Sequence, residues 1–241
     1  MSAPRPLPAL ADATVSIVGV GGLGSPAASQ LAAAGVGNLR LLDDDLVEPS
    51  NLPRQLLYED RDVGAAKVDC AARKLTERYP DTRTVGLFER LEEATHQRLL
   101  AGSDIVLDGS DNVATKYLLN ALALRLRIPL IHAGLTGFRA QLMTILPGET
   151  ACLRCAFGDL PADTATDRDD DEPVCQQAGV IGPLPTLFGV LQALEAIKLL
   201  ERAGTPIVNR LLLHDAAAGR WRTVEVRQDP HCRDCRLASF R

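Results

Sequence analysis

Short apolar segments alternate with longer amphipathic segments along the first 135 residues of the chain. The first of them, TVSIVGV (14–20), is rich in β-branched residues and ends in glycines, which is typical of a buried strand. Pro26 fits the first turn of a following helix, and Pro80 lies just beyond the end of another. The pattern predicts strands over 14–20, 38–45, 82–88, 104–112 and 128–134, and helices over 23–35, 63–80, 91–101 and 113–127.

This alternation predicts an α/β fold of Rossmann-like type, in which helices cover both faces of a mainly parallel sheet. The pattern changes after residue 135. FRAQLMTILPGE (138–149) alternates apolar and polar residues, as an added antiparallel strand does. A strongly apolar segment over 184–203 predicts a helix, and 209–227 predicts a hairpin around Gly219. The predicted sheet is therefore extended by antiparallel strands in the C-terminal part of the chain.

One domain over 1–241 is the expected organisation, because no repeat or linker interrupts the pattern, and the proline-rich residues 1–13 are expected to be irregular. Hydrophobic residues make up 46% and charged residues 24% of the chain, which is ordinary for a globular enzyme with a sizeable core. A net charge of -5 and an aromatic content of 4% argue against a nucleic-acid surface. No apolar run or N-terminal segment suggests a membrane span or a signal peptide, so we expect a cytoplasmic protein.

The glycine loop GVGGLG (19–24) matches G-x-G-x-x-G between a predicted strand and a predicted helix. Glycines at this place let backbone N–H groups approach a phosphate at the helix N-terminus. Asp43 falls at the end of the second strand, where a carboxylate can accept the ribose hydroxyls of a nucleotide. These features fit NAD and ATP equally, and a tight turn without a ligand is a further alternative.

Three residues farther along the chain favour ATP over NAD. Arg54 offers a fork suited to phosphate oxygens and Lys67 a point charge, although each could instead form a surface salt bridge. Asp111, in SDN (110–112), is a hard oxygen ligand that could hold Mg²⁺ on a triphosphate. Its alternative role is to cap the helix over 113–127, which the neighbouring Ser or Asn would also do.

Two Cys-x-x-Cys pairs predict a closed tetrahedral zinc site of structural type, which would tie the C-terminal tail to the body of the fold. The alternative is a pair of redox dithiols. The four candidate ligands are Cys152, Cys155, Cys232 and Cys235.

Two further cysteines and two histidines are isolated in the sequence. Cys70, inside a predicted helix, is expected to be buried and inert. Cys175 follows the acidic segment DRDDDEP (167–173) and is either a nucleophile or an incidental thiol. His132 and His214 lie on apolar strands and are expected to be core histidines.

Together these segments resemble the ThiF/MoeB/HesA family, the bacterial relatives of ubiquitin-activating enzymes. The likeness rests on the glycine loop and the acidic strand end that follows it, and on EPSNLPRQ, VGAAK, VLDGSDN, CQQAGVIGP, LQALEAIKLL and both cysteine pairs, in family order from about residue 14 to 235. GLTGFRAQLMTILPGE and CQQAGV look closer to ThiF than to MoeB.

The resemblance implies ATP-dependent adenylation of the C-terminal glycine of a small ubiquitin-fold sulfur-carrier protein ending in Gly-Gly, with Mg²⁺ on the nucleotide. It also implies a homodimer, a sulfur-donor protein as a further partner, and a mobile loop over 156–175 that crosses the site. By position, Arg54, Lys67 and Asp111 would be catalytic, and Cys175 aligns with the ThiF cysteine that can bond to the thiocarboxylated carrier. The residues placed at ATP are Gly19, Gly21, Gly22, Gly24, Asp43, Asp45, Ser50, Asn51, Arg54, Gln55, Lys67, Asp111 and Asn112.

One departure from the family pattern concerns the N-terminal segment. Family members carry a Tyr-x-Arg-Gln motif whose arginine reaches the ATP of the neighbouring subunit, and residues 1–13 contain no match to it. Another arginine then substitutes, or phosphate contacts are fewer, or catalysis is impaired. This departure leaves two alternatives to carrier adenylation: adenylation of a peptide or small-molecule carboxylate, and a catalytically silent carrier-binding homologue. A third alternative, an NAD(P)-dependent oxidoreductase, rests only on the glycine loop and Asp43.

Overall fold

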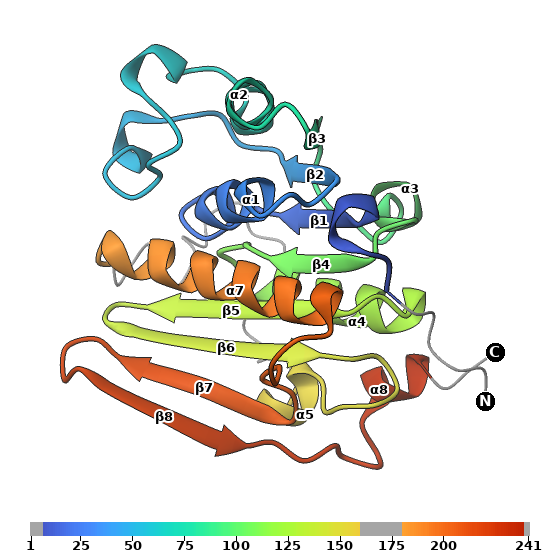
Figure 1. Cartoon of the computed structure of the whole chain (residues 1–241). Coiled ribbons are helices and arrows are strands. Elements are labelled where there is room, and N and C mark those ends of the chain that lie inside the picture. The colour runs from blue at the N-terminus through green and yellow to red at the C-terminus, as the bar shows by residue number, and fades with distance from the viewer. Residues whose placement is uncertain (1–6, 160–179, 239–241) are drawn as a thin grey trace.

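The computed structural model describes residues 7–159 and 180–238, and in these residues the strands form one eight-stranded sheet (Figure 1). The strand order is β3-β2-β1-β4-β5-β6-β7-β8, with parallel pairing from β3 through to β5 and antiparallel pairing from β5 to β8. This confirms the predicted Rossmann-like sheet with an antiparallel extension. The strands are β1 (Thr14–Val18), β2 (Asn38–Asp43), β3 (Arg83–Phe88), β4 (Ile105–Asp108), β5 (Leu130–Thr136), β6 (Arg139–Ile145), β7 (Arg210–Asp215) and β8 (Arg220–Glu225).

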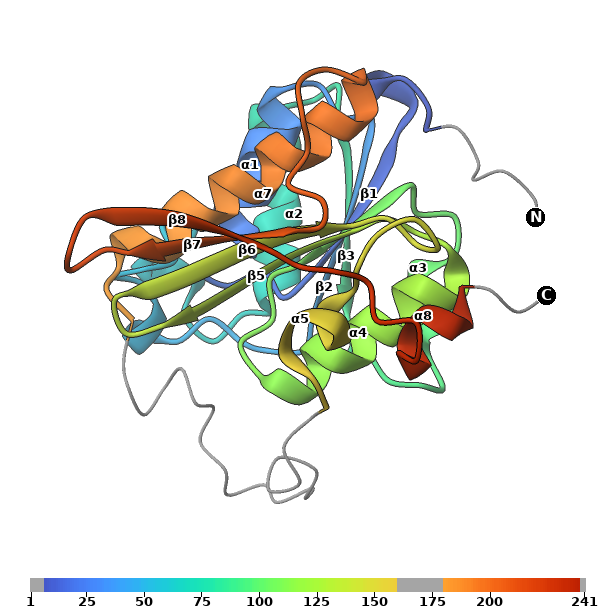
Figure 2. The same ribbon diagram turned by 90° about the horizontal axis from the view of Figure 1, so that it is seen from below.

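The helices lie in two layers, one on each face of the sheet, as Figure 2 shows. One layer holds α1 (Gly24–Ala33), α2 (Lys67–Arg78) and α7 (Pro183–Glu201). The other holds α3 (His96–Leu100), α4 (Val113–Leu126), α5 (Leu153–Phe157) and α8 (Arg233–Leu237). Short 3₁₀ helices, η1 (Leu10–Asp12), η2 (Pro49–Asn51) and η3 (Asp60–Asp62), occupy connections.

Each face of the sheet has its own hydrophobic core. On β4, Ile105 and Leu107 belong to the cluster that includes residues of α1, α2 and α7, whereas Val106 between them belongs to the cluster that includes residues of α4, α5 and α8. Side chains of a strand point to opposite faces in turn, so a continuous apolar strand fills both cores. This explains why the apolar residues of β4 follow one another without alternation.

The predicted helix over 63–80 begins later than expected, at Lys67. Gly64 has a φ of +86°, which a helix cannot continue through, and Ala66 forms a bridge with Leu46. The backbone before Lys67 therefore pairs with another segment, and the lysine stands at the first turn of α2.

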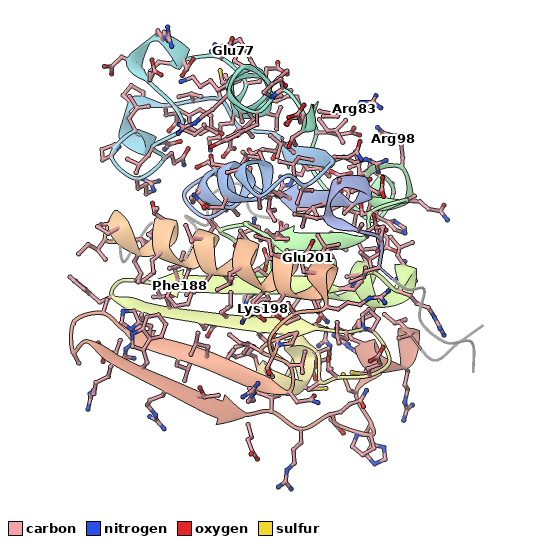
Figure 3. The ribbon with its side chains drawn as sticks, viewed as in Figure 1. Glu77, Arg83, Arg98, Phe188, Lys198 and Glu201 are labelled. Carbon is pink, nitrogen blue, oxygen red and sulfur yellow. The ribbon has the colours of Figure 1, made fainter. Side chains whose placement is uncertain are left out.

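One helix, Pro183–Glu201, is long and apolar enough to cross a membrane by length and composition, but half of its most apolar window is buried inside the fold. Its residue Phe188, labelled in Figure 3, is fully buried and stacks with His214, which in turn stacks on Trp221 at a ring distance of 3.9 Å. His214 is thus half-buried under aromatic contacts, whereas His132 is buried as expected. The apolar character of α7 is that of a core helix.

Candidate functional site

A cavity of about 670 Å³ opens beyond the carboxyl ends of the parallel strands, the edge at which the arrowheads of β1, β2, β4 and β5 point the same way in Figure 1. Ligands of parallel α/β sheets bind at this edge. Every residue that the family resemblance places at ATP lines the cavity, except Gly24. The fold thus brings together four segments that are separated in sequence: the glycine loop, the end of β2 with the loop that follows it, the start of α2, and the turn after β4.

The glycine loop packs closely against the turn after β4. A Cβ on Gly19 would lie 2.6 Å from the carbonyl oxygen of Gly109, and the φ of Gly19 is +85°. A Cβ on Gly24 would lie 1.9 Å from the Gly19 carbonyl oxygen, so this third glycine lets α1 begin directly on the loop. Gly24 therefore serves the packing of the loop, while Gly19, Gly21 and Gly22 face the cavity.

Asp43 is a buried carboxylate whose orientation is set by the backbone. Its Oδ2 accepts a hydrogen bond from the N–H of Val20 at 2.6 Å, and its Oδ1 accepts one from the N–H of Asp45 at 2.9 Å. Burial raises the pKa of Asp43, and the nearby positive charge of Lys67 opposes this. Lys67 Nζ in turn lies 2.6 Å from Asp45 Oδ2. A fixed carboxylate beside a buried ammonium suits a ligand with both hydroxyl groups and negative charge.

The loop after β2 adds a second cation to the cavity. The Nη1 of Arg54 donates to the carbonyl oxygen of Ser50 at 2.9 Å, which curls the segment around η2. Gln55 is buried, and its Oε1 has no hydrogen-bond partner among the described residues. A buried polar atom without a partner is uncommon in folded proteins, and here the side chain borders the cavity.

The turn after β4 decides between the two roles considered for Asp111. Asn112 is the N-cap of α4, because its Oδ1 accepts a hydrogen bond from the N–H of Thr115 at 2.8 Å. Asp111 is exposed, lines the cavity, and makes no hydrogen bond or ion pair within the described residues. Its carboxylate is therefore free to act as a hard oxygen ligand, and the capping role belongs to its neighbour.

Sequence reasoning missed a buried charged cluster beneath this turn. Lys116 Nζ lies 3.3 Å from both carboxylate oxygens of Asp108, and His132 Nδ1 lies 2.7 Å from Asp108 Oδ2. Burial opposes ionisation of Asp108, but Lys116 and then the His132 hydrogen bond outweigh it and lower its pKa to about 2. Burial lowers the pKa of His132, which favours a neutral ring. The sequence feature that could have indicated this buried charge is the lysine within the mostly apolar helix segment VATKYLLN (113–120).

The four cysteines of the two Cys-x-x-Cys pairs come together between α5 and α8. The Sγ atoms lie 3.8 Å apart for Cys152 and Cys155, 3.6 Å for Cys152 and Cys232, and 3.5 Å for Cys155 and Cys235. Four sulfurs at about 2.3 Å from a zinc ion lie about 3.8 Å apart in a tetrahedron. The donor set and its spacing therefore fit a closed Zn²⁺ site, and a shared cluster is not the arrangement of two separate redox dithiols.

Side chains around the cluster brace its two halves. The Nδ2 of Asn120, on α4, donates to Asp234 Oδ2 at 2.9 Å, and its Oδ1 accepts from the N–H of Leu153 at 3.0 Å. Arg154 forms an ion pair with Asp234. Burial raises the pKa of Cys232 to about 11, so its thiol stays protonated at neutral pH unless a cation displaces the proton.

Comparison with known proteins identifies the chain. A model described as the ThiF family matches residues 5–235. The chain belongs to the ThiF family. This ThiF-family chain is 41% identical over 227 residues to the "Sulfur carrier protein ThiS adenylyltransferase" of Escherichia coli, a match that covers 94% of this chain and 87% of the relative. It is 38% identical over 232 residues to the E. coli "Molybdopterin-synthase adenylyltransferase", covering 94% and 88%.

A further relative is the "SAMP-activating enzyme E1" of Haloferax volcanii, 40% identical over 94% of this chain and 81% of the relative. Among solved structures, E. coli MccB with ATP superimposes with a TM-score of 0.81 at 24% identity, over 94% of this chain and 67% of MccB. That likeness supports the ThiF-type fold. The named relatives are adenylyltransferases or activating enzymes, in agreement with the expected family.

Two cysteines of this ThiF-family chain, Cys70 and Cys175, lie outside the four-cysteine cluster in sequence. Cys70 is buried on α2, as predicted. Cys175 lies outside the described residues, as does most of the segment over 156–175, and its role as a nucleophile stays a prediction.

Proposed function

We propose that this protein is an ATP- and Mg²⁺-dependent adenylyltransferase that activates the C-terminal glycine carboxylate of a ubiquitin-fold sulfur-carrier protein ending in Gly-Gly. The observation that carries the proposal is the cavity itself, which combines a glycine loop with Arg54, Lys67 and the carboxylate of Asp111, a group with no hydrogen bond or ion pair among the described residues. A site for hydride transfer with NAD needs neither these two cations nor a carboxylate that can bind Mg²⁺. The sulfur-carrier adenylyltransferases at about 40% identity support the carrier as substrate.

The chemistry follows from these groups. The carrier carboxylate attacks the α-phosphorus of ATP in line, the bond to the bridging oxygen breaks, and pyrophosphate leaves with that electron pair. No protein nucleophile is needed, so positioning and charge neutralisation supply the catalysis. Mg²⁺, held by Asp111, would neutralise charge on the phosphates. Asp43 would bind the ribose, and the N–H groups of the glycine loop would approach phosphate oxygens.

Lys67 is suited to contact phosphate because it is only partly engaged. Its ammonium carries three N–H donors, and among the described residues Asp45 accepts the one hydrogen bond that Nζ makes. The remaining donors can reach phosphate oxygens in the cavity that Lys67 lines. Asp45 then serves to orient the lysine beside the ribose-binding position.

The test is exchange of labelled pyrophosphate into ATP, measured with purified ubiquitin-fold carriers, ThiS among them. We expect exchange with an intact carrier and none with the same carrier lacking its Gly-Gly end. Arg54→Ala should lower exchange by about 100-fold, the scale of losing one charged transition-state contact. Arg61→Ala is the matched control, because Arg61 is exposed, pairs with Glu59 and does not line the cavity.

Other outcomes separate the alternatives. Exchange with a peptide or small carboxylic acid in place of any carrier would indicate a different substrate. Carrier binding without exchange would indicate a silent homologue, and binding of NADH without ATP would indicate an oxidoreductase. The single domain over 1–241, the homodimer, the sulfur-donor protein, the cytoplasmic location and the zinc ion are part of the same proposal.

For Cys175 the proposal is a thioester bond to the thiocarboxylated carrier: the Cys175 thiolate attacks the C-terminal carbonyl carbon, the carbon–sulfur bond of the thiocarboxylate breaks, and hydrosulfide leaves. Intact mass after reaction with that carrier should show an adduct that is lost in Cys175→Ser.

A further inference from the structure

The buried cluster beneath the cavity contains a lysine that the chemistry above does not use. Lys116, on the first turn of α4, donates to the carbonyl oxygen of Ser110 at 2.6 Å and to that of Ala133 at 2.9 Å, besides its contacts with Asp108. It therefore ties three elements together: the turn after β4, the strand β5 and the start of α4. Lys116 and Asp108 are both buried.

The ammonium of Lys116 has no donor to spare. Three N–H bonds face four protein oxygens, since both oxygens of Asp108 lie 3.3 Å away and two carbonyl oxygens lie closer. Lys67, whose Nζ has a single partner among the described residues, is the contrasting case. Although both lysines line the cavity, Lys116 is bound by the fold and is not available to a phosphate.

What Lys116 holds is the backbone on one side of Asp111. Ser110 is fixed through its carbonyl by Lys116, and through its N–H and Oγ by Asp108 Oδ1, at 3.1 and 2.6 Å. On the other side, Asn112 is fixed by its cap on α4, and its carbonyl accepts the N–H of Lys116. Asp111 thus has a side chain without a hydrogen-bond or ion-pair partner in residues 7–159 and 180–238, on a backbone that is anchored at both neighbours.

We propose that Lys116 is a positioning residue for the Asp111 carboxylate, holding the turn over 110–112 so that Asp111 presents a preformed oxygen ligand to nucleotide-bound Mg²⁺. The inference rests on the proposed function, because it assumes that Mg²⁺·ATP occupies the cavity. Groups that hold metal ligands in place commonly change metal affinity by about 10- to 100-fold when removed.

The readout is the Mg²⁺-dependent part of ATP binding, obtained by calorimetric titration of each protein with ATP in the presence and absence of Mg²⁺. In Lys116→Met this Mg²⁺-dependent gain in affinity should fall by about 10- to 100-fold, while binding of metal-free ATP is kept. A Lys116→Met change leaves the Asp108 charge buried without its main counter-charge and so lowers stability. The double variant Asp108→Asn with Lys116→Met removes both charges, keeps an acceptor for Ser110, and should show the same loss of Mg²⁺ dependence in a better-folded protein.

A matched control and a coupled variant separate positioning from general destabilisation. Lys74 is likewise tied to a buried acid, 2.5 Å from Asp62, and to a carbonyl, 2.9 Å from that of Leu57, but it does not line the cavity. Lys74→Met should lower stability and leave the Mg²⁺ dependence as in the wild type. If Lys116 acts through Asp111, Lys116→Met should have no further effect on Mg²⁺ dependence in an Asp111→Asn background.

Three results overturn the proposal. One is a folded double variant with the Mg²⁺ dependence of the wild type, and another is an equal loss in Lys74→Met. The third is a loss in the Asp111→Asn background as large as in the wild type. Failure of the proposed function is distinguishable, because it would show already in the wild type as absence of ATP binding or of carrier-dependent exchange.

Discussion

Helix α4 borders two polar sites that differ in how completely the protein satisfies them. At its start lies the cavity, where the exposed carboxylate of Asp111 has no partner within the described residues. On its other side α4 contacts α5 and α8, where four cysteines, three of them buried, lie together and the amide of Asn120 bonds to Asp234 and to the backbone of Leu153. In the cavity the carboxylate of Asp111 is open to a bound ligand. Between α5 and α8 the four cysteine sulfurs surround one common centre.

The difference separates a site that binds from a site that holds the fold. Metal sites that leave a position open serve chemistry, whereas closed four-ligand sites serve structure. The same distinction applies within the cavity, where Lys116 has all its donors occupied and Lys67 does not. The number of protein partners around a polar group therefore indicates whether its role is to position or to bind.

The largest expected effect is on the closed site. Removing the proposed zinc ion with a chelator, or changing Cys152 to Ala, should lower the free energy of unfolding by more than about 4 kcal/mol, because the cluster joins the C-terminal tail to α5. Denaturant unfolding with metal analysis of the intact protein measures this. Cys70→Ala, at a buried cysteine outside the cluster, should cost only about 1 kcal/mol. A metal-free wild type of unchanged stability would contradict the structural role.

The next effect concerns the open site and should appear in catalysis alone. Asp111→Asn should lower carrier-dependent pyrophosphate exchange by about 100-fold, or about 2.7 kcal/mol. Its stability should change by less than about 0.5 kcal/mol, because the side chain makes no contact that folding depends on. Asn112→Ala, which removes the cap of α4, should instead cost about 1 kcal/mol of stability. Equal stability losses in the two variants would contradict the assignment of the cap to Asn112.

The smallest effect concerns pH and the buried cluster that underlies the open site. Burial lowers the pKa of His132 below its ordinary value of 6.5, so the unfolded chain takes up a proton there that the folded protein does not. Stability should therefore fall as the pH drops below about 6.5, by at most about 1.4 kcal/mol per pH unit from this residue. Denaturant unfolding at pH 5.5 and 7.5 should show a shallower fall in His132→Gln. If the free energy of unfolding changes with pH equally in the wild type and in His132→Gln, His132 is protonated in the folded state.

The amino-acid sequence by itself determined the order and type of the main elements. The helix over 113–127 and the strand over 14–20 were expected close to their observed bounds, because each carries its own local pattern of apolar residues and its own end signals. The glycine loop and the paired cysteines were also evident, since spacing alone carries that chemistry. The five-residue helices α5 and α8 were not predicted, because helices this short depend on tertiary contacts.

Only the tertiary structure decided which polar group does what. Ser110, Asp111 and Asn112 are all good capping residues, and the choice of Asn112 depends on the backbone angles that the packed turn adopts. Asp108 lies 8 residues from Lys116 and 24 residues from His132 in sequence, so neither side chain carried a local signal that it would pair with Asp108. Local patterns specify where a strand or helix forms, but the burial and pairing of charges depend on contacts between elements.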